Sequence, residues 1–387
     1  MHTVIVGAGI AGLNSARYLA QSGQSVTVLE KNSKPGGRIA TDHIDGFTCD
    51  VGFQLLNPQY PEAKKSLNLP ALDLHAFSRG AVICEDDRQF TLSDPTRHPL
   101  ALPSLLRECS VTDARAAYSL LKDRESTTFD QALERAGFSA SLERAARTFL
   151  AAVTADSSLE CTPEFGRKLI YYFLKGSPSL PAQGMEAIAY QMADLDGVTI
   201  RYSTEIVEII EEDQQVLLRC SDGKDLHADR VIVAGGPLES AYLLDSEVPA
   251  TGDLTTWWFA ADQRPTASTY LHLDCSDNPL INHAAVVSNV CPSYAPAGQH
   301  LIQASVVGSS DLEAEVVAQR VQRMFGCEGD TWRLLTCHRV SPALPIMTGR
   351  SAWSPTGKLA VAGDFNQASI QGALASGRQA ASLSGSQ

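Results

Sequence analysis

The chain has 387 residues, of which 44% are hydrophobic and 19% are charged, a composition typical of a folded protein too long for one ordinary domain. Its 31 Lys and Arg residues stand against 44 Asp and Glu residues, which gives a net charge of −13 at pH 7. Because such a surface repels phosphate backbones, nucleic acid is excluded as an expected partner.

A βαβ unit is predicted at the start of the chain. Thr3 to Val6 have the apolar pattern of a short buried strand, and helical spacing of apolar residues follows from Ile10 until Gly23. Ser25 to Leu29 then read as a second strand. This order predicts two parallel strands joined by a helix.

The turn after the first strand has the spacing of a dinucleotide-binding site. Glycines there allow a tight turn, close approach of the backbone to a pyrophosphate and close packing of helix on strand. The N–H groups at the helix start favour an anion. The residues expected at the pyrophosphate are Gly7, Gly9, Ile10, Ala11 and Gly12. Glu30, at the end of the second strand, is expected to accept hydrogen bonds from a ribose diol, which argues against a 2′-phosphate.

The middle of the chain alternates between helical and strand patterns. Residues 78–175 read as mostly helical, with amphipathic segments FDQALERAGF and SLERAARTFLAAV and no catalytic motif. The segment PAQGMEAIAYQMADL predicts another helix. Short strands are then expected at Val198–Tyr202, Ile206–Ile210, Val216–Cys220 and 228–236, as a small β-meander before the chain rejoins the main sheet.

A discontinuous two-domain organisation is expected from this alternation. Residues 254–308 have the pattern of a separate sheet, and SSDLEAEVVAQRVQRMF predicts a capped amphipathic helix. The expected α/β architecture has one nucleotide-binding domain made of residues 1–78, 176–245 and 340–387. Residues 79–175 and 246–339 are expected to form an α+β substrate domain.

Further motifs resemble those of a known superfamily. KPGGRIAT at 34–41 and DVGFQLL at 50–56 are similar to the second glycine motif of flavin amine oxidases, protoporphyrinogen oxidases and phytoene desaturases. PAQGM, EIVEI, ADRVIVAGGP, SPALP and the closing AGDFNQASIQGALASGRQAA follow in the order of that superfamily. The resemblance implies a Rossmann-type FAD-binding domain in which both ends of the chain bind one FAD.

Individual positions take roles from this resemblance. Asp364, after Gly363, is implied to accept a hydrogen bond from the ribityl or diphosphate side, and Ile206 to contact the adenine. Arg38 is implied beside the pyrophosphate or the ring edge, and Gly36, Gly37, Phe53 and Gln54 are implied to line the flavin. Amides at Ile370, Gln371 and Gly372 start a helix and can stabilise negative charge on a reduced ring. No cysteine lies near Gly363, where some monoamine oxidases attach the cofactor, so the FAD is expected to be non-covalent.

The expected reaction is transfer of a hydride from a small organic substrate, an amine or an apolar molecule, to flavin N5. Many amine oxidases of the superfamily use a lysine near N5, but TTWWFAADQRPTASTYLHL contains none. Hydride transfer to a flavin needs no protein acid or base, and the catalytic side chains are not identified from the sequence. His43, His283 and His338 lie nearest to the motifs and are expected to be packing or surface residues.

Three alternatives stay open. The first is an FAD-dependent desaturase or isomerase of an isoprenoid-like lipid, the second an NAD-dependent dehydrogenase, and the third a flavin-binding scaffold without activity. No spacing of His, Cys or carboxylates suggests a metal site. No apolar run approaches the roughly 20 residues of a membrane span, and MHTVIVGAG has no leader pattern, so a cytoplasmic protein is expected.

Overall fold

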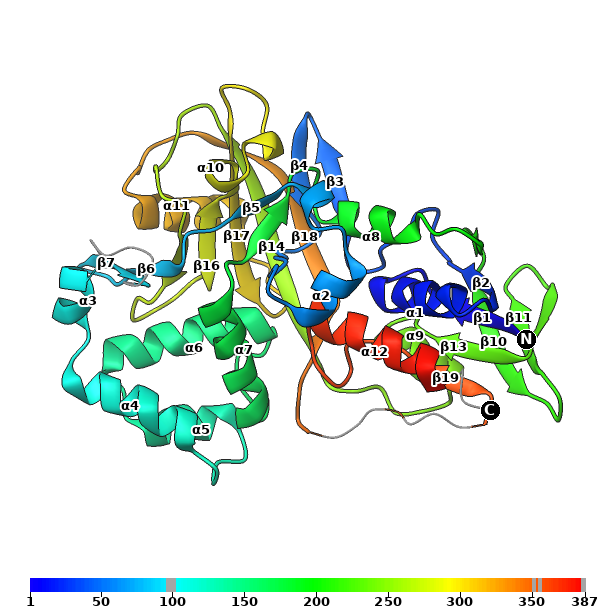
Figure 1. Ribbon diagram of the computed structural model, residues 1–387. Helices are drawn as coiled ribbons and strands as arrows, with labels where there is room; N and C mark the ends of the chain where they lie inside the picture. Colours follow the sequence, from blue (N-terminus) through cyan, green and yellow to red (C-terminus); the bar gives the residue numbers. More distant parts are fainter. Residues whose placement is uncertain (95–101, 350–352, 354–356, 384–387) are drawn as a thin grey trace.

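Two sheets of different construction organise the protein. The computed structural model describes residues 1–94, 102–349, 353 and 357–383. A parallel sheet lies at the end that holds both termini, and a larger, mainly antiparallel sheet lies at the other end (Figure 1). This arrangement confirms the predicted α/β fold class.

The parallel sheet is assembled from distant parts of the chain. Its strands, in spatial order, are β19 (Leu359–Val361), β13 (Arg230–Val233), β1 (His2–Val6), β2 (Ser25–Leu29) and β9 (Val198–Arg201). The helices that pack on it are α1 (Ile10–Gln21), α8 (Glu186–Ala193), α9 (Pro237–Leu243) and α12 (Ile370–Leu383). Apolar residues of β1 are buried on both faces, as expected for a parallel sheet covered on both sides.

A small antiparallel meander adjoins this sheet. It consists of β10 (Ile206–Glu211), β11 (Val216–Cys220) and β12 (Asp225–Ala228). The expectation that Val198–Tyr202 belongs to the meander is wrong, because β9 pairs in parallel with β2. The short strand therefore extends the nucleotide-type sheet, since its apolar residues cover the end of the core beside α1.

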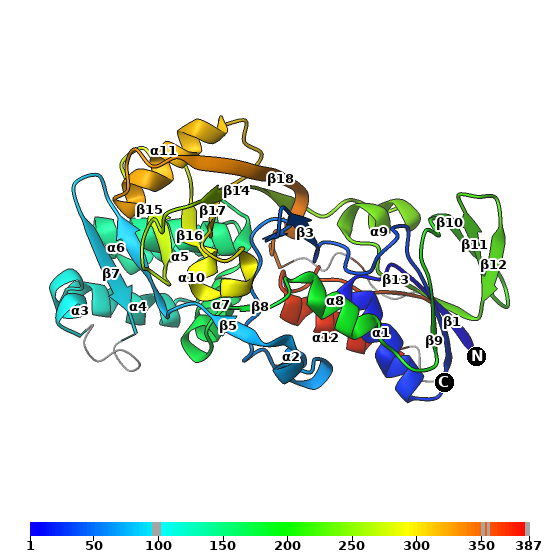
Figure 2. The same ribbon diagram turned by 90° about the horizontal axis from the view of Figure 1, so that it is seen from above.

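The larger sheet has strand order β18, β14, β17, β16, β15, β6 and β7. Its strands are β6 (Gly80–Cys84), β7 (Gln89–Ser93), β14 (Thr251–Ala261), β15 (Leu271–Asp274), β16 (His283–Val286), β17 (His300–Val307) and β18 (Trp332–Pro345). One face packs against α11 (Ala314–Phe325), which lies outside β14 and β18 in Figure 2. The interval expected to divide two domains at residues 339 and 340 lies inside the unbroken strand β18.

Two expectations about the second half of the fold are wrong. Residues 78–175 are not helical from the start, because β6 and β7 form a hairpin whose alternating apolar residues complete the larger sheet. The helix expected from Ser309 begins only at Ala314, after the N-cap Glu313, and no side chain caps it. Polar residues before Ala314 instead bond to the sheet, as the Ser310 amide does to Thr255 Oγ1.

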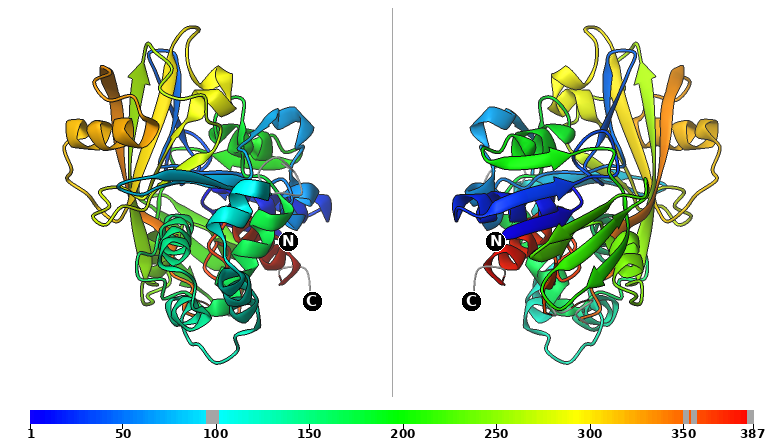
Figure 3. Two further views of the ribbon diagram at one scale, coloured as in Figure 1. Left: turned by 90° about the vertical axis from the view of Figure 1, so that its left-hand side faces the viewer. Right: turned by 90° about the vertical axis from the view of Figure 1, so that its right-hand side faces the viewer.

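A helical layer covers the lower part of the larger sheet (Figure 3). Its members are α3 (Leu102–Glu108), α4 (Val111–Lys122), α5 (Phe129–Ala136), α6 (Ala140–Thr154) and α7 (Pro163–Lys175). Ser110, Thr128 and Thr162 cap α4, α5 and α7 by accepting backbone N–H bonds. The buried residues of α5 to α7 form one apolar cluster with Phe129 fully buried.

Short elements connect the two sheets. They are the hairpin β3 (Thr41–Ile44) and β4 (Phe47–Asp50), the pair β5 (Leu74–Ala76) and β8 (Ser179–Pro181), and the helices α2 (Pro61–Ser66), η1 (Pro70–Leu72), α10 (Val287–Val290) and η3 (Pro292–Tyr294). The segments with flavin-like motifs at 34–41 and 50–56 lie in or beside these connections, and they therefore reach both sheets.

Candidate active site

The two ends of the chain meet at one edge of the parallel sheet. Because β1 and β19 point the same way, α1 and α12, which follow them, both begin at this edge. The two helices pack side by side (Figure 1), and Asn14 Nδ2 donates to the Leu374 carbonyl at 2.6 Å. A Cβ on Gly377 would lie 2.3 Å from the Ala11 carbonyl oxygen, so only glycine allows this approach.

The glycines of the first turn have three different surroundings. Gly7 has a φ of 108°, in the region that favours glycine, and a Cβ there would meet the Ala234 carbonyl. A Cβ on Gly12 would lie 2.1 Å from the Gly7 carbonyl oxygen. A Cβ on Gly9 would meet nothing within 4 Å, so open space lies in front of the backbone at the start of α1.

Glu30 is held beside this turn. Its side chain is buried, with Oε2 accepting the Ala8 amide at 2.7 Å and Oε1 accepting both nitrogens of Asn32 at 2.8 and 2.9 Å. The Thr204 amide donates to the Glu30 carbonyl, which brings the start of β10 and the buried Ile206 to the same region. The carboxylate is thus fixed in place, and its oxygens keep further lone pairs for a ligand.

The second glycine motif closes on the first. The Gly36 amide donates to the Ala8 carbonyl at 2.9 Å, and Gly37 lies beside the Gly9 backbone. The guanidinium of Arg38 binds Asp364 Oδ1 and the Ala343 carbonyl through its two Nη atoms. The structure therefore joins the motif at residues 34–41 to both SPALP and the closing segment.

At the closing segment, some groups expected to face a flavin are engaged within the protein. The Gly372 amide donates to Ser369 Oγ at 3.1 Å, and Gln371 Oε1 accepts the Glu62 amide at 2.9 Å. The Gly363 amide donates to Ser376 Oγ. Ile370 lies at the first position of α12, next to the start of α1 in the same apolar core.

Residues 50–56 carry the site towards the larger sheet. Gln54 Nε2 donates to the Arg38 carbonyl at 2.6 Å, which ties this segment to the second motif. The Phe53 ring packs against Phe77 and against His283 of β16, with ring centroids 5.9 and 5.2 Å apart. Phe53 and Gln54 thus lie between the two sheets.

Asp50 is a functional-region residue that the sequence analysis did not single out. Its carboxylate is completely enclosed and accepts bonds from the Thr41 hydroxyl, the Met185 amide and the Tyr294 hydroxyl at 2.6 to 2.9 Å. Burial raises the pKa of Asp50 to about 6, although the three donors oppose this shift. Its position at the head of DVGFQLL was a signal that could have identified it.

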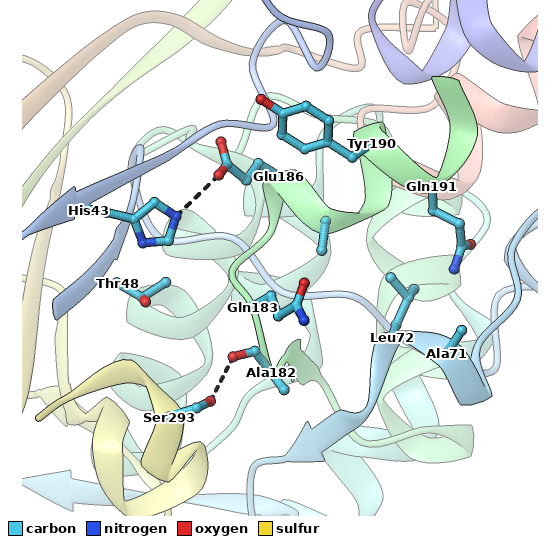
Figure 4. Close-up of a pocket in the computed structure, with 11 residues that line it drawn as sticks. His43, Thr48, Ala71, Leu72, Ala182, Gln183, Glu186, Tyr190, Gln191 and Ser293 are labelled. Atoms are coloured by element: carbon cyan, nitrogen blue, oxygen red, sulfur yellow. Dashed lines mark hydrogen bonds and ion pairs between the residues drawn. The ribbon is translucent and has the colours of Figure 1, made fainter. Parts of the chain in front are cut away.

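A cavity of about 640 Å³ lies elsewhere, between the β3–β4 hairpin, η1 and α8. Figure 4 shows His43 bonded to Glu186 on one wall and Ser293 bonded to the Ala182 carbonyl on the other. Among the described residues that line it there is none of the expected cofactor-binding residues. The cavity is therefore separate from the edge where the two glycine motifs meet.

The residues at the sheet edge fit an anionic dinucleotide. Open space in front of Gly9, the fixed carboxylate of Glu30 and the guanidinium of Arg38 match a pyrophosphate flanked by a ribose. In the part of the chain that the structure describes, no three His, Cys, Asp or Glu side chains gather as they would around a metal ion. No helix within the same residues is both long and apolar enough to cross a bilayer.

Comparison with known proteins gives a family-level match. The sequence profile described as flavin containing amine oxidoreductase matches residues 10–383. Putrescine oxidase of Kocuria rosea is 34% identical over 95 residues, which are 24% of this chain and 19% of that protein. The carotenoid 3,4-desaturase of Haloarcula japonica is 50% identical over 48 residues, 12% of this chain and 10% of that protein. These stretches span a fifth or less of the relatives' own lengths.

Solved structures share the fold over the whole chain. An oxidoreductase from Methanosarcina mazei has a TM-score of 0.80 at 21% identity, covering 98% of this chain and 99% of the other. A putative protoporphyrinogen oxidase from Exiguobacterium sp. 255-15 has a TM-score of 0.75 at 18% identity, with 99% and 98% covered. Putrescine oxidase with bound putrescine has a TM-score of 0.70 at 16% identity, with 99% of each chain covered. At these identities the likeness is one of fold.

Proposed function

Since the chain belongs to the flavin-containing amine oxidoreductases, we propose that it binds FAD non-covalently and oxidises a small organic substrate by hydride transfer. The observation that carries this proposal is the meeting of three segments at one sheet edge: the first glycine turn, residues 36–38 and the closing segment with Asp364. An NAD-dependent dehydrogenase would use the first turn alone. The joined Arg38 and Asp364 favour a cofactor that continues beyond the pyrophosphate.

Each segment has a distinct task in this proposal. The turn at Gly7 to Gly12 and the start of α1 bind the pyrophosphate, while Glu30 binds the ribose and Ile206 contacts the adenine. Arg38 neutralises the phosphates and at the same time orients Asp364 towards the ribityl chain. When bound, the flavin supplies N5 as the hydride acceptor.

The start of α12 is proposed to stabilise charge. Hydride transfer leaves negative charge at one edge of the ring, and N–H groups at a helix start stabilise such charge. The Ile370 and Gln371 amides take this role, since the Gly372 amide is bonded to Ser369. Small residues after them let α12 lie close to α1.

The substrate is proposed to lie between the flavin and the larger sheet. We keep the division into a cofactor half, residues 1–78, 176–245 and 340–387, and a substrate half, residues 79–175 and 246–339. Phe53 and its contact with His283 lie at the junction of the two halves. The face of the larger sheet that covers residues 50–53 is then the substrate side.

The proposal is tested by the visible spectrum of the purified protein, photoreduced without oxygen and followed as air is admitted. A flavin band, and FAD released on heat or acid denaturation, is the expected result; no band even after addition of FAD would refute the proposal. Release of NAD instead would favour the dehydrogenase.

Recovery of the band distinguishes the remaining alternatives. Rapid recovery in air indicates an oxidase, for which amines are the first substrates to screen. Slow recovery favours a quinone or another soluble acceptor, and with it a desaturase or isomerase of an isoprenoid-like lipid. A flavin that no substrate class reduces would identify a scaffold.

A further inference from the structure

A row of polar side chains crosses the larger sheet where an apolar face would be expected. In the register of the sheet, His338 of β18 is opposite Thr256 of β14, Thr256 is opposite Ser305 of β17, and Ser305 is opposite His283 of β16. Cross-strand partners share a face, so these four side chains lie in line. Gln303, two residues before Ser305, lies on the same face.

This row lies over the second half of the flavin-like motif. Leu254 and Trp258, which flank Thr256 on the same face of β14, contact residues of that motif: Leu254 packs over Gly52, and Trp258 Nε1 donates to the Asp50 carbonyl at 3.1 Å. The opposite face of the sheet packs against α11 through Trp257 and is apolar. The polar residues are therefore confined to the side that faces the proposed cofactor.

The hydrogen bonds within the row are incomplete. The Thr256 and Ser305 hydroxyls lie 2.7 Å apart, and Gln303 Nε2 lies 2.5 Å from Ser305 Oγ and 3.5 Å from His283 Nδ1. Gln303 is fully buried, yet among the described residues its Oε1 has no partner. Since a buried acceptor without a partner costs about 1–3 kcal/mol, this position calls for a group from outside the chain.

The row is also uncharged. Burial lowers the pKa of His283 to about 4, so its imidazole is neutral at pH 7. The two carboxylates that adjoin the row are engaged elsewhere: Asp42 with His338 Nε2 at 3.0 Å, and Asp50 with its three donors. A cation placed on the row would find no carboxylate free to pair with it.

We infer that Thr256, Ser305, Gln303 and His283 form the subsite that binds the polar group of the substrate, and that this group is an uncharged one that both donates and accepts hydrogen bonds. A hydroxyl, an amide or a neutral amine has this chemistry. A protonated diamine would be desolvated without a counter-ion, and a hydrocarbon would leave Gln303 Oε1 unpaired. The inference rests on the proposed function, because it places the substrate between the sheet and the flavin.

The test uses the flavin-loaded protein and four probes with one ring skeleton: benzamide, benzyl alcohol, benzylammonium and toluene. Dissociation constants are measured at pH 7 from the change in flavin absorbance, without turnover. We expect benzamide and benzyl alcohol to bind about tenfold or more tightly than the other two, the difference made by one buried hydrogen bond. Gln303→Met is expected to abolish this preference while toluene binding is kept.

A matched control is offered by Gln322 of α11, a buried glutamine on the opposite side of the sheet, whose Nε2 donates to the Asp330 carbonyl. Gln322→Met should leave all four affinities unchanged. Ser305→Ala serves as a second variant if Gln303→Met does not fold, and it should weaken benzamide binding while leaving toluene binding unchanged.

The possible failures are distinguishable. Protein that retains no FAD refutes the proposed function. Protein that retains FAD but binds toluene or benzylammonium as tightly as benzamide refutes the inference alone. An unchanged preference in both Gln303→Met and Ser305→Ala would also overturn it.

Discussion

Replacement of Asp50 should change how the stability of the protein depends on pH. The pKa of this carboxyl is raised from 3.8 to about 6 in the folded protein because it is buried. The folded state therefore holds the proton more tightly than the unfolded state does. This contribution to stability is fully present below pH 3.8 and is lost as the pH rises through about 6.

The magnitude follows from the shift. About two pKa units correspond to about 3 kcal/mol over the whole window, of which about 2 kcal/mol is lost between pH 4.5 and 7.5. Asp50→Asn keeps an oxygen for the Thr41 hydroxyl and the Met185 amide, and the Tyr294 hydroxyl can turn to accept from the new amide. It should remove the pH dependence at little structural cost.

Asp50→Ala should be far more damaging. It leaves three enclosed donors without an acceptor, of which the Met185 amide cannot reorient, and we expect a loss of about 3–6 kcal/mol in the free energy of unfolding. Because the β3–β4 hairpin and the turn before α8 both depend on Asp50, the segment 51–54 should also be loosened.

The assay is urea unfolding at pH 4.5 and 7.5, followed by tryptophan fluorescence, since Trp258 bonds directly to the Asp50 backbone. Asp45→Asn, an exposed site in the turn of the same hairpin with a φ of 51° that asparagine tolerates, controls for the loss of one negative charge. If Asp50→Asn shows the same pH slope as the parent protein, or if Asp50→Ala costs no more than Asp50→Asn, the reasoning is refuted.

Two further predictions concern the cofactor edge. Gly12→Ala should yield little folded protein, because its Cβ would lie 2.1 Å from the Gly7 carbonyl oxygen, whereas Gly9→Ala should fold with an unchanged thermal midpoint but retain less FAD per chain; equal FAD content in Gly9→Ala and the parent would contradict this. Arg38→Lys should weaken FAD binding at least tenfold, because one ammonium cannot reproduce the two-nitrogen grip on Asp364 and the Ala343 carbonyl; FAD titration of the apoprotein measures it, and parental affinity would exclude the proposed role.

Local patterns predicted the elements whose residues depend mainly on sequence neighbours. The βαβ opening is one case: the apolar run before Gly7 and the helical spacing after Gly9 correspond to β1 and α1. The family and the flavin-type fold were predicted for the same reason, since glycine spacing reflects local backbone needs. The hairpin of β6 and β7 was missed because its strands are stabilised by pairing with β15, which lies far along the chain.

Tertiary structure decided which of the conserved-looking pieces actually touch. The sequence by itself determined that two glycine motifs and a closing aspartate are present, because each is a short pattern of residue types. Only the fold brought Arg38 to Asp364, enclosed Asp50 among three donors and aligned His283 with Thr256 and Ser305 across three strands. These contacts join residues up to 326 positions apart, and they depend on strand order and register, which no local pattern encodes.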